Sequence, residues 1–581
     1  MGTVDDGDAA DAAQDAPAVS FDYDVLVVGS GFGGSVTALR LTEKGYRVGV
    51  LEAGARFDET SYPSTSWDLK RFLFAPALGC YGIQRIDVLK NCLILSGAGV
   101  GGGSLVYANT LYEPLDPFYR DPSWSHITDW RAELAPYLAQ AKRMLGVVEY
   151  PNFTPADAVM KRVADDMGVG ATFHPTPVGV FFGSPGEEVD DPYFGGAGPR
   201  RRGCIECGEC MTGCRHHAKN TLTKNYLFLA EHAGAKVFAL TTVTAVRPAP
   251  GGGYLVDVRR TDGVRRRTTI LSAEQVVLAA STLGTQTLLH RMRDRGLLPN
   301  LSERLGVLTR TNSESIVGAM AKSVDVDYSR GVAITSSFHP DEHTHVEPVR
   351  YGKGSNAMSL LQTVLTDDDE GRPRWQVWAA KMWADRGQIR DQYDLRHWSE
   401  RTVIALVMQT LDNSITTFTK RSAVTGRRTL TSRQGHGAPN PNWIQVANQV
   451  ARRMASVVDG TPGGSIGEPF NRPMTAHFIG GCAMGDSPET GVIDPYHRVF
   501  GHRGLHIVDG SAISANLGVN PALTITALAE RAMAYWPNMG GVDQRPEPGD
   551  TYVSLNAVPP RKPAVPVGAP SALHLPLVEI R

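Results

Sequence analysis

The sequence predicts an α/β protein in which a Rossmann-type, dinucleotide-binding domain is interleaved with an α+β domain built on an antiparallel sheet. Three observations predict this class. A strand–glycine–helix–strand unit occupies residues 24–52, buried strands typical of the same domain return within residues 222–289 and 504–510, and strand-like stretches alternate with polar ones over residues 300–460. The length of 581 residues exceeds what one hydrophobic core usually supports, so two domains are expected.

The first unit carries a glycine pattern typical of dinucleotide binding. It contains Gly29, Gly31, Phe32, Gly33 and Gly34 between an apolar strand at 25–28 and a helix at 35–44. Gly29 makes the turn, Gly31 lets the backbone approach a pyrophosphate, and Gly34 lets the helix pack on the strand. Glu52 ends the next strand, about where an acidic residue accepts from a ribose hydroxyl. An ordinary βαβ unit is the alternative, and this unit alone does not separate NAD from FAD.

A second glycine run predicts contact with a flat ligand. Its candidate cofactor contacts are Gly99, Gly101, Gly102, Gly103 and Ser104, followed by Asn109. So many glycines disfavour a helix or strand but allow backbone to pass close to a ligand. The neighbours Val100 and Leu105 are apolar, which argues against the alternative of a flexible surface loop. Val243 and Ala280 end two further predicted strands of this domain and complete the candidate contacts there.

Composition limits the class of partner. The net charge of −2 gives no sign of nucleic-acid binding, and no run of 18 apolar residues predicts a transmembrane helix. Residues 1–20 hold five aspartates without an apolar core, which predicts a disordered leader and not an export signal. We therefore expect a cytoplasmic protein, with peripheral contact to a membrane left open.

Four of the seven cysteines lie within eleven residues, at Cys204, Cys207, Cys210 and Cys214. This C-x2-C-x2-C-x3-C spacing is that of the bacterial ferredoxin run without its final proline, and it favours an iron–sulfur cluster in a reducing compartment. Zinc, an unoccupied site and disulfides are the alternatives. Cys80, in a predicted loop, is the preferred outside ligand, while Cys92 is expected in the core.

Taken in order, the chain predicts seven segments. They are a disordered leader at 1–20, the dinucleotide-binding domain at 21–130, 222–300 and 471–540, a helical and loop segment with the cysteines at 131–221, the second domain at 301–470, and a proline-rich tail at 541–581 that is extended or disordered. Expected helices cover 135–145, 154–168 and the stretch from Pro521. Expected strands are 236–243, 254–258, 264–270, 276–280, 332–336, 345–350, 402–409 and 415–420.

Together with both glycine runs, the motifs His477-Phe-Ile-Gly-Gly, Asp509-Gly510 and Val519-Asn520-Pro521 resemble those of the glucose–methanol–choline family of FAD oxidoreductases, in particular the cholesterol oxidase branch. The resemblance covers about residues 21–540. It implies FAD rather than NAD, an FAD-binding domain interleaved with a substrate domain whose antiparallel sheet covers the flavin, and an alcohol as hydride donor, plausibly a 3β-hydroxysteroid.

The resemblance also assigns site residues. His477 matches the histidine that orients or deprotonates the alcohol, Asn520 the asparagine beside the flavin, and Asp509, Gly510 and Pro521 flavin contacts. Glu347 loosely matches the carboxylate that moves a proton when the steroid double bond isomerises, with a solvated strand residue as the alternative. A neutral imidazole suits His477 for its role, since it can take a proton as the hydride leaves.

Two departures from the cholesterol oxidase pattern shape the functional hypothesis. Tyr107 stands where those oxidases carry asparagine, and they lack the cluster at Cys204–Cys214. Some dehydrogenases of the wider family carry such a cluster, which implies a 4Fe–4S or 3Fe–4S centre passing electrons to an acceptor protein or quinone in steroid metabolism. The alternatives are an oxidase that uses O2 without a cluster, a steroid or alkene reductase fed by a reduced partner, and a non-enzymatic electron-transfer flavoprotein. Cys482 is expected near the flavin.

Overall fold

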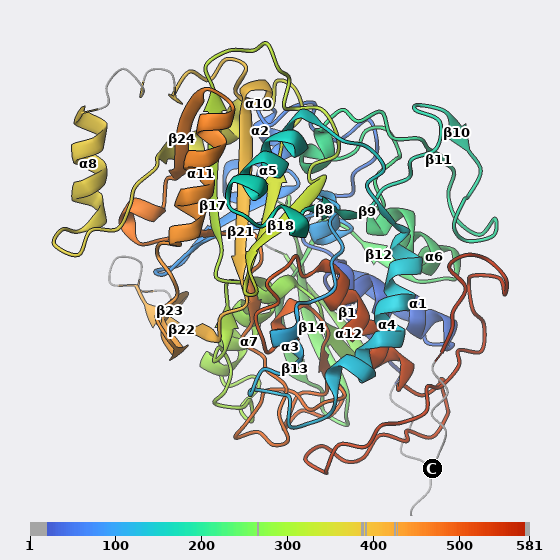
Figure 1. Ribbon diagram of the computed structural model, residues 1–581. Coiled ribbons are helices and arrows are strands. Elements are labelled where there is room, and N and C mark those ends of the chain that lie inside the picture. The colour runs from blue at the N-terminus through green and yellow to red at the C-terminus, as the bar shows by residue number, and fades with distance from the viewer. Residues whose placement is uncertain are drawn as a thin grey trace, which may run out of the picture.

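The computed structural model describes residues 20–575 except 264–266, 385–388, 390, 391, 423–425 and 427. Residues 1–19 of the predicted leader, part of the predicted strand at 264–270 and the end of the tail therefore lie outside the described residues. Two seven-stranded sheets organise what is described, one in the lower and one in the upper half of Figure 1. Within the described ranges, no helix has the length and apolar character needed to cross a membrane.

The first sheet is the predicted Rossmann-type sheet. Its parallel strands are β12 (Lys236–Phe238), β2 (Val48–Leu51), β1 (Tyr23–Val28), β15 (Thr268–Leu278) and β27 (Leu505–Ile507). The antiparallel strands β14 (Tyr254–Arg260) and β13 (Thr241–Pro248) extend it beyond β15. β1 and β2 are apolar and buried, as a parallel sheet covered on both faces requires. The helices α1 (Phe32–Glu43), α6 (Tyr226–His232) and α12 (Ala522–Ala534) pack together against it.

Two predicted boundaries in this sheet are wrong. The expected strand at 236–243 is split, because Leu240 adopts a left-handed backbone with φ of 51° and the chain turns from β12 into β13. The expected strands at 264–270 and 276–280 belong to one long strand, β15. Its first half pairs with β14 and its second half with β1, so a single strand joins the antiparallel and parallel parts.

The second sheet is antiparallel, as predicted. Its strands are β20 (Gln362–Val364), β24 (Gly460–Ser465), β17 (Ser315–Ala321), β21 (Thr402–Gln409), β19 (Thr344–Val349), β18 (Ser336–Asp341) and β8 (His174–Pro175). The expected strand at 332–336 is wrong, since β18 begins only at Ser336. Alternation along β21 sends Val403, Ala405 and Val407 toward α5 (Pro155–Asp166) and α11 (Gln445–Val457), which cover one face. Ile404 and Leu406 face the opposite way, into the cavity described below.

Smaller sheets join the two large ones. One contains β23 (Arg428–Gly437), β22 (Asn413–Arg421), β16 (Thr309–Arg310) and β26 (Ile479–Gly480), and another contains β25 (Met474–Thr475), β6 (Leu93–Gly97) and β5 (Gln84–Val88). β25 and β26 flank His477, so both small sheets hold this residue in place. The segment that links them to the second sheet carries Asn312 and Glu314, which become important at the site.

Helix boundaries follow their caps. α5 begins as predicted, with Thr154 and Asp157 forming a capping box. α4 (Trp130–Leu145) begins five residues before the predicted start because Asp129 caps it, so Pro136 lies inside the helix and not in its first turn. Between residues 541 and 575 the described chain has no helix or strand. It runs back over α1 and α12, where Val558 N–H donates to Ala534 and Lys562 N–H to Glu43.

Candidate active site

A cavity of about 600 Å³ opens where the parallel strands of the first sheet end. It is lined by Gly29, Glu52 and Ala279, which directly follow β1, β2 and β15, and by Asp509, the second residue after β27. This is the usual ligand position in an open α/β sheet. Most predicted site residues line this cavity: Gly29, Gly31, Phe32, Gly33, Glu52, Gly102, Gly103, Val243, Ala280, His477, Asp509, Gly510, Asn520 and Pro521. Gly34, Gly99, Gly101, Ser104, Asn109 and Glu347 are not among the lining residues.

The glycine motif forms a cradle that fits a dinucleotide. A Cβ atom on Gly31 would meet nothing within 4 Å, so this backbone faces the open cavity. A Cβ atom on Gly34 would lie 2.2 Å from the Gly29 carbonyl oxygen, which shows how closely α1 packs on the turn. The second glycine run lies against the first, since a Cβ on Gly102 would come within 2.7 Å of Gly31 Cα. Both runs therefore present backbone to the cavity, which fits the pyrophosphate and ring system of FAD.

Glu52 lies at the end of β2 and is already hydrogen-bonded by the protein. Ser30 donates to Oε2 from its N–H (3.1 Å) and its hydroxyl (2.7 Å), and Gly54 N–H donates to Oε1 (2.9 Å). Burial raises the pKa of Glu52, while these donors lower it. A carboxylate has about four acceptor positions, so Glu52 can still accept from a ribose hydroxyl. Its place in the cavity wall fits the predicted role.

His477 lies in the cavity wall and is oriented by a buried carboxylate that sequence reasoning missed. His477 Nδ1 is 3.0 Å from Glu314 Oε2. The carboxylate also accepts from Thr475 Oγ1 (2.9 Å) and Ala476 N–H (3.0 Å), and the Glu314 side chain is fully buried. Since a carboxylate only accepts, the imidazole proton is held at Nδ1, and Nε2 is the acceptor nitrogen of the ring. Nothing near Glu314 in the sequence marks it, because the pair is 163 residues apart.

Asn520 connects His477 to Glu347. Its Nδ2 lies 3.4 Å from His477 Nε2 and donates to Glu347 Oε2 at 3.2 Å. Glu347 is fully buried, so the alternative of a solvated strand residue is wrong. Burial raises the pKa of Glu347 to about 8, and the nearby Glu314 adds to this, while the Asn520 hydrogen bond opposes it. The carboxyl group thus lies behind Asn520, next to the cavity and outside its immediate lining.

The loop that carries Asn520 is fixed by a buried polar network. Asn312 Oδ1 accepts from the N–H groups of Leu517 (3.2 Å) and Gly518 (2.9 Å), and Asn312 Nδ2 donates to the Val519 carbonyl at 3.0 Å. Asn312 itself is fully buried and has a left-handed φ of 58°, a conformation that asparagine tolerates well. The last three residues before Asn520 therefore have their backbone held by one side chain.

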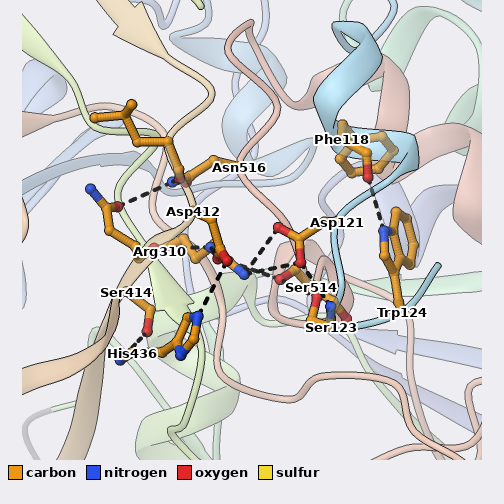
Figure 2. A network of polar contacts seen from close by, with 12 residues as sticks. Phe118, Asp121, Ser123, Trp124, Arg310, Asp412, Ser414, His436, Ser514 and Asn516 are labelled. Atoms are coloured by element: carbon orange, nitrogen blue, oxygen red, sulfur yellow. Dashed lines mark hydrogen bonds and ion pairs between the residues drawn. The ribbon is translucent and has the colours of Figure 1, made fainter. Parts of the chain in front are cut away.

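A second layer, shown in Figure 2, fixes the start of the same loop. The fully buried Arg310 forms ion pairs with Asp121 (3.2 Å) and Asp412 (3.0 Å), and its Nε donates to the Ser514 carbonyl at 2.8 Å. Ser123 Oγ donates to the same carbonyl at 3.2 Å. Arg310 and Asp121 are both buried, so separating these two charges is costly, and the network makes the loop a rigid support for Asn520.

The far wall of the cavity is apolar. It is formed by the inner face of the second sheet through Ile316, Val349, Ile404 and Leu406, with Ile334 beside them. Met358, Leu361 and Trp398 continue the apolar lining. A wall of this kind excludes water and suits a bulky hydrocarbon more than a sugar.

The four clustered cysteines meet at a separate small cavity. Cys204, Cys207, Cys210 and Cys214 all line it, together with Glu209, His216 and Lys219. Ligand atoms of Cys207, Glu209 and His216 also lie within 4.8 Å of one another. All seven cysteines are free, so the disulfide alternative finds no support. Four thiols around one space form a donor set that fits a metal ion or a cluster.

This small cavity shares a wall with the large one. Cys210 lines the former, and the next residue, Met211, lines the latter. Lys219 Nζ donates to the carbonyls of Cys210 (2.7 Å) and Tyr107 (2.8 Å), and Tyr107 also lines the large cavity. Asn109, predicted as a flavin contact, is fully buried beside the Cys210 thiol and does not line the large cavity.

The other three cysteines do not line the small cavity. Cys80 lies in the short strand β4 (Cys80–Tyr81), so its expected role as an outside ligand is not supported. Cys92 is fully buried in the core, as expected. Cys482 is also fully buried, and burial strongly raises the pKa of its thiol. Its N–H donates to Ser511, two residues after the cavity residue Asp509.

Comparison with known proteins agrees with the geometry. Models of the GMC oxidoreductase family match residues 199–292 and 465–529, and a model of the NAD(P)-binding Rossmann-like domain matches residues 27–63. The chain is 62% identical to a cholesterol oxidase of Mycobacterium tuberculosis (strain ATCC 25618 / H37Rv) over 95% of this chain and 98% of that protein. It is 43% identical to a cholesterol oxidase of Acinetobacter baumannii over 89% and 95% of the two chains.

A solved structure shares the fold. Pyridoxine 4-oxidase from Mesorbium loti aligns with a TM-score of 0.55 at 14% identity, over 88% of this chain and 98% of the other. The family models and the two cholesterol oxidases agree on the class of enzyme. The chain belongs to the GMC oxidoreductase family, in its cholesterol oxidase-like branch, and is an FAD-dependent oxidoreductase acting on CH–OH donors.

Proposed function

We propose that this enzyme oxidises the hydroxyl group of a bulky apolar alcohol, and that the alcohol is a 3β-hydroxysteroid. The observation that carries this proposal is one continuous cavity that joins the dinucleotide cradle, the His477–Asn520 pair and the apolar wall of the second sheet. The relatives named cholesterol oxidase support a sterol as the substrate.

In this proposal His477 is the general base. When bound, FAD supplies the oxidant by accepting a hydride from the carbon that bears the hydroxyl. His477 Nε2 takes the hydroxyl proton, because Glu314 holds the ring proton at Nδ1. Asn520 lies beside Nε2, so its amide can donate to the alcohol oxygen and orient it. The apolar wall keeps water away from the reacting carbon.

Glu347 is proposed to move the proton when the steroid double bond isomerises. Its Oε2 accepts from Asn520, next to the end of the cavity where the hydroxyl would lie. A base must be ionised to accept a proton, and its pKa of about 8 leaves the carboxyl largely protonated at neutral pH. The isomerisation step is therefore expected to accelerate as pH rises through about 8.

We further propose that Cys204, Cys207, Cys210 and Cys214 hold an iron–sulfur cluster of the 4Fe–4S or 3Fe–4S type. Such a cluster would supply one-electron transfer to an acceptor protein or quinone. The support is the convergence of four thiols on one cavity and the shared wall at Cys210 and Met211. Zinc bound by the same thiols is the competing occupant.

Metal analysis tests this site directly. Iron, acid-labile sulfide and zinc would be measured on anaerobically purified protein, with an EPR spectrum before and after dithionite. We expect about three or four irons per flavin, the content of one cluster. Cys207→Ser should lower that content, whereas Cys80→Ser is the matched control. Zinc in place of iron, or neither metal, would reject the cluster.

Anaerobic mixing with a 3β-hydroxysterol tests the oxidation. We expect the flavin absorbance to bleach and the 3-ketosteroid to form, and we expect no bleaching with a sterol that already carries the ketone. His477→Gln should slow bleaching by about 10²- to 10⁴-fold, the usual contribution of a general base. His232→Gln, at the exposed end of α6, is the control. Unchanged bleaching in His477→Gln would overturn the assignment.

A second candidate function is an oxidase that passes electrons to O2, and the name cholesterol oxidase of the two relatives described above favours it. Peroxide yield and turnover with O2, compared with turnover with an artificial one-electron acceptor, separate the two. A reductase that runs the chemistry backwards would instead show substrate-driven oxidation of pre-reduced flavin. A sterol substrate would be drawn from a membrane. Peripheral contact of the enzyme with a membrane therefore stays a prediction.

A further inference from the structure

A row of histidines leads from Glu347 to the surface. His345 and Glu347 are two residues apart on β19, so their side chains share one face of the second sheet. His345 Nε2 lies 3.9 Å from Glu347 Oε1, and both side chains are fully buried. His339 on β18 stacks on His345 with ring centroids 4.8 Å apart, and His174 on β8 stacks on His339 at 5.8 Å.

The outer two rings reach solvent. His174 and His339 are partly exposed, and β18 and β8 are the last two strands at this edge of the sheet. His174 is held in place, because its Nδ1 donates to the Thr172 carbonyl (2.8 Å) and its Nε2 lies 3.1 Å from Ser337 Oγ. The row therefore runs from a fully buried carboxyl group to the protein surface within three side chains.

The buried end of this row has polar atoms that no protein group satisfies. Both ring nitrogens of His345, Oε1 of Glu347 and Oδ1 of Asn520 are buried without a hydrogen-bond partner in the described structure. Buried polar atoms of this kind are usually paired with ordered water. Two of these atoms, His345 Nε2 and Glu347 Oε1, lie only 3.9 Å apart. Unpaired polar atoms this close together are unusual in an apolar core, and they suit a path for proton transfer.

We propose that Glu347, His345, His339 and His174 form a proton relay between the active-site end of the cavity and the surface. The purpose of the relay rests on the proposed function, since alcohol oxidation sends a hydride to the cofactor and leaves one proton at His477. That proton has to reach solvent before the next turnover. Asn520 lies within 3.4 Å of His477 and 3.2 Å of Glu347, so the base and the relay flank one amide. The amide does not carry the proton itself. In the proposal the proton crosses from His477 to Glu347 through ordered water held by the unpaired Asn520 Oδ1 and Glu347 Oε1.

The charges around His345 suit this role. The titratable groups around it are Glu347 on its own strand, His339 and His174 on the neighbouring strands, His477 in the active site, and Tyr112, whose ring meets the imidazole edge-on at 4.8 Å. Burial, and then the two neighbouring histidines, lower the pKa of His345 well below its ordinary value. A neutral ring can accept a proton at one nitrogen while it releases another from the opposite nitrogen, so each transfer is balanced without a co-reactant. Because the rings are stacked and their nitrogens point outward in the ring plane, in the proposal the proton passes between rings through water bound at these nitrogens.

The test follows the exchange of the Glu347 carboxyl proton by infrared spectroscopy, which needs neither substrate nor turnover. Protein at a pH well below 8, where Glu347 is protonated, is mixed rapidly with D2O, and the carboxyl band that is missing in Glu347→Gln is followed. We expect exchange at least about tenfold slower in His345→Phe than in the wild-type enzyme. His343→Gln, at an exposed position two residues away on the same hairpin, should exchange at the wild-type rate.

A second variant keeps the proposal testable if His345→Phe does not fold. His339→Ala removes the partly exposed middle ring, so exchange should again slow down and added imidazole should restore it. Wild-type exchange rates in both variants, or slowing that imidazole leaves unchanged in His339→Ala, would overturn the relay. Flavin bleaching by sterol in the wild-type enzyme is scored separately, so failure of the proposed function and failure of the relay are distinguishable.

Discussion

His477 owes its chemical state to Glu314, a residue far away in the chain. The carboxylate accepts from His477 Nδ1 and from two neighbouring groups of the same loop, so it fixes both the tautomer and the orientation of the ring. The resemblance to the family pointed to His477 and Asn520, through the motifs His477-Phe-Ile-Gly-Gly and Val519-Asn520-Pro521. Glu314 lies in a polar stretch without a motif, and only folding brings it to the histidine.

Glu314→Gln should therefore slow the reaction while the cavity and its lining residues stay in place. The amide can donate as well as accept, so the imidazole loses its fixed tautomer. We expect anaerobic flavin bleaching by sterol to slow by at least about tenfold, as when a histidine base loses its orienting carboxylate. Glu303→Gln, whose side chain is 94% exposed, is the matched control. Equal bleaching rates in the two variants would show that Glu314 does not orient the base.

Glu347 predicts a pH dependence of stability. Its folded pKa of about 8 lies above the ordinary value, so between about 4.5 and 8 the folded state keeps a proton that the unfolded chain releases. The free energy of unfolding contributed by this group therefore falls as pH rises through that window and stays low above it. Glu347→Gln is neutral at every pH, so it should stabilise the protein by a few kcal/mol above pH 8 and change little near pH 4.5.

Thermal unfolding of both proteins across that range measures the effect. Parallel curves of Tm against pH would show that Glu347 is not held neutral in the folded state.

At the scale of elements, the sequence predicted the strands that are buried and the helices that have clear caps. β1, β2, β21 and α5 lie where their apolar patterns and capping residues placed them. The errors share a physical cause, since pairing with distant strands decided them. β15 is long because it has different partners along its two halves, and no local pattern records those partners. The loop before Asn520 likewise has no regular structure to predict, and it is fixed by Asn312.

Asn312→Ala tests that support. The substitution leaves the N–H groups of Leu517 and Gly518 buried without their acceptor, so we expect the free energy of unfolding to fall by at least about 2 kcal/mol. Sterol-driven bleaching should slow as well, because Asn520 loses its support. Asn471→Ala is a matched control, since Asn471 is exposed and has nearly the same left-handed φ, 56° against 58°. Urea unfolding that gives the same loss for both variants would contradict the role of Asn312.

At the scale of the whole molecule, the cavity is made by both large sheets together. The first sheet contributes the cradle at the ends of β1 and β2, and the second contributes the apolar wall. The sequence indicated the fold class and most of the cradle through local motifs. It did not place Asn109 against Cys210 or put Glu347 behind Asn520, because these contacts depend on how the two sheets meet.

Removal of FAD is therefore expected to loosen the contact between the two sheets. A ligand that binds only the folded state stabilises it by about 4 kcal/mol when present at 1,000 times its Kd. We expect the deflavinated protein to unfold at a lower temperature, and added FAD to restore the original Tm. ADP offers a comparison, since it would fill only the part of the cradle near Glu52 and leave the region beside His477 open. Equal Tm values with and without FAD would show that the cavity is not its binding site.

The most direct test of the account is the primary deuterium isotope effect on anaerobic flavin bleaching, with a sterol that carries deuterium in place of hydrogen on the carbon of its 3β-hydroxyl. If that carbon gives up its hydride in the cavity beside His477, bleaching is slower with the deuterated sterol than with the ordinary one. Absence of bleaching, or bleaching at equal rates with both sterols when the chemical step is observed in a single turnover, would contradict hydride transfer from a sterol alcohol as the function of this site.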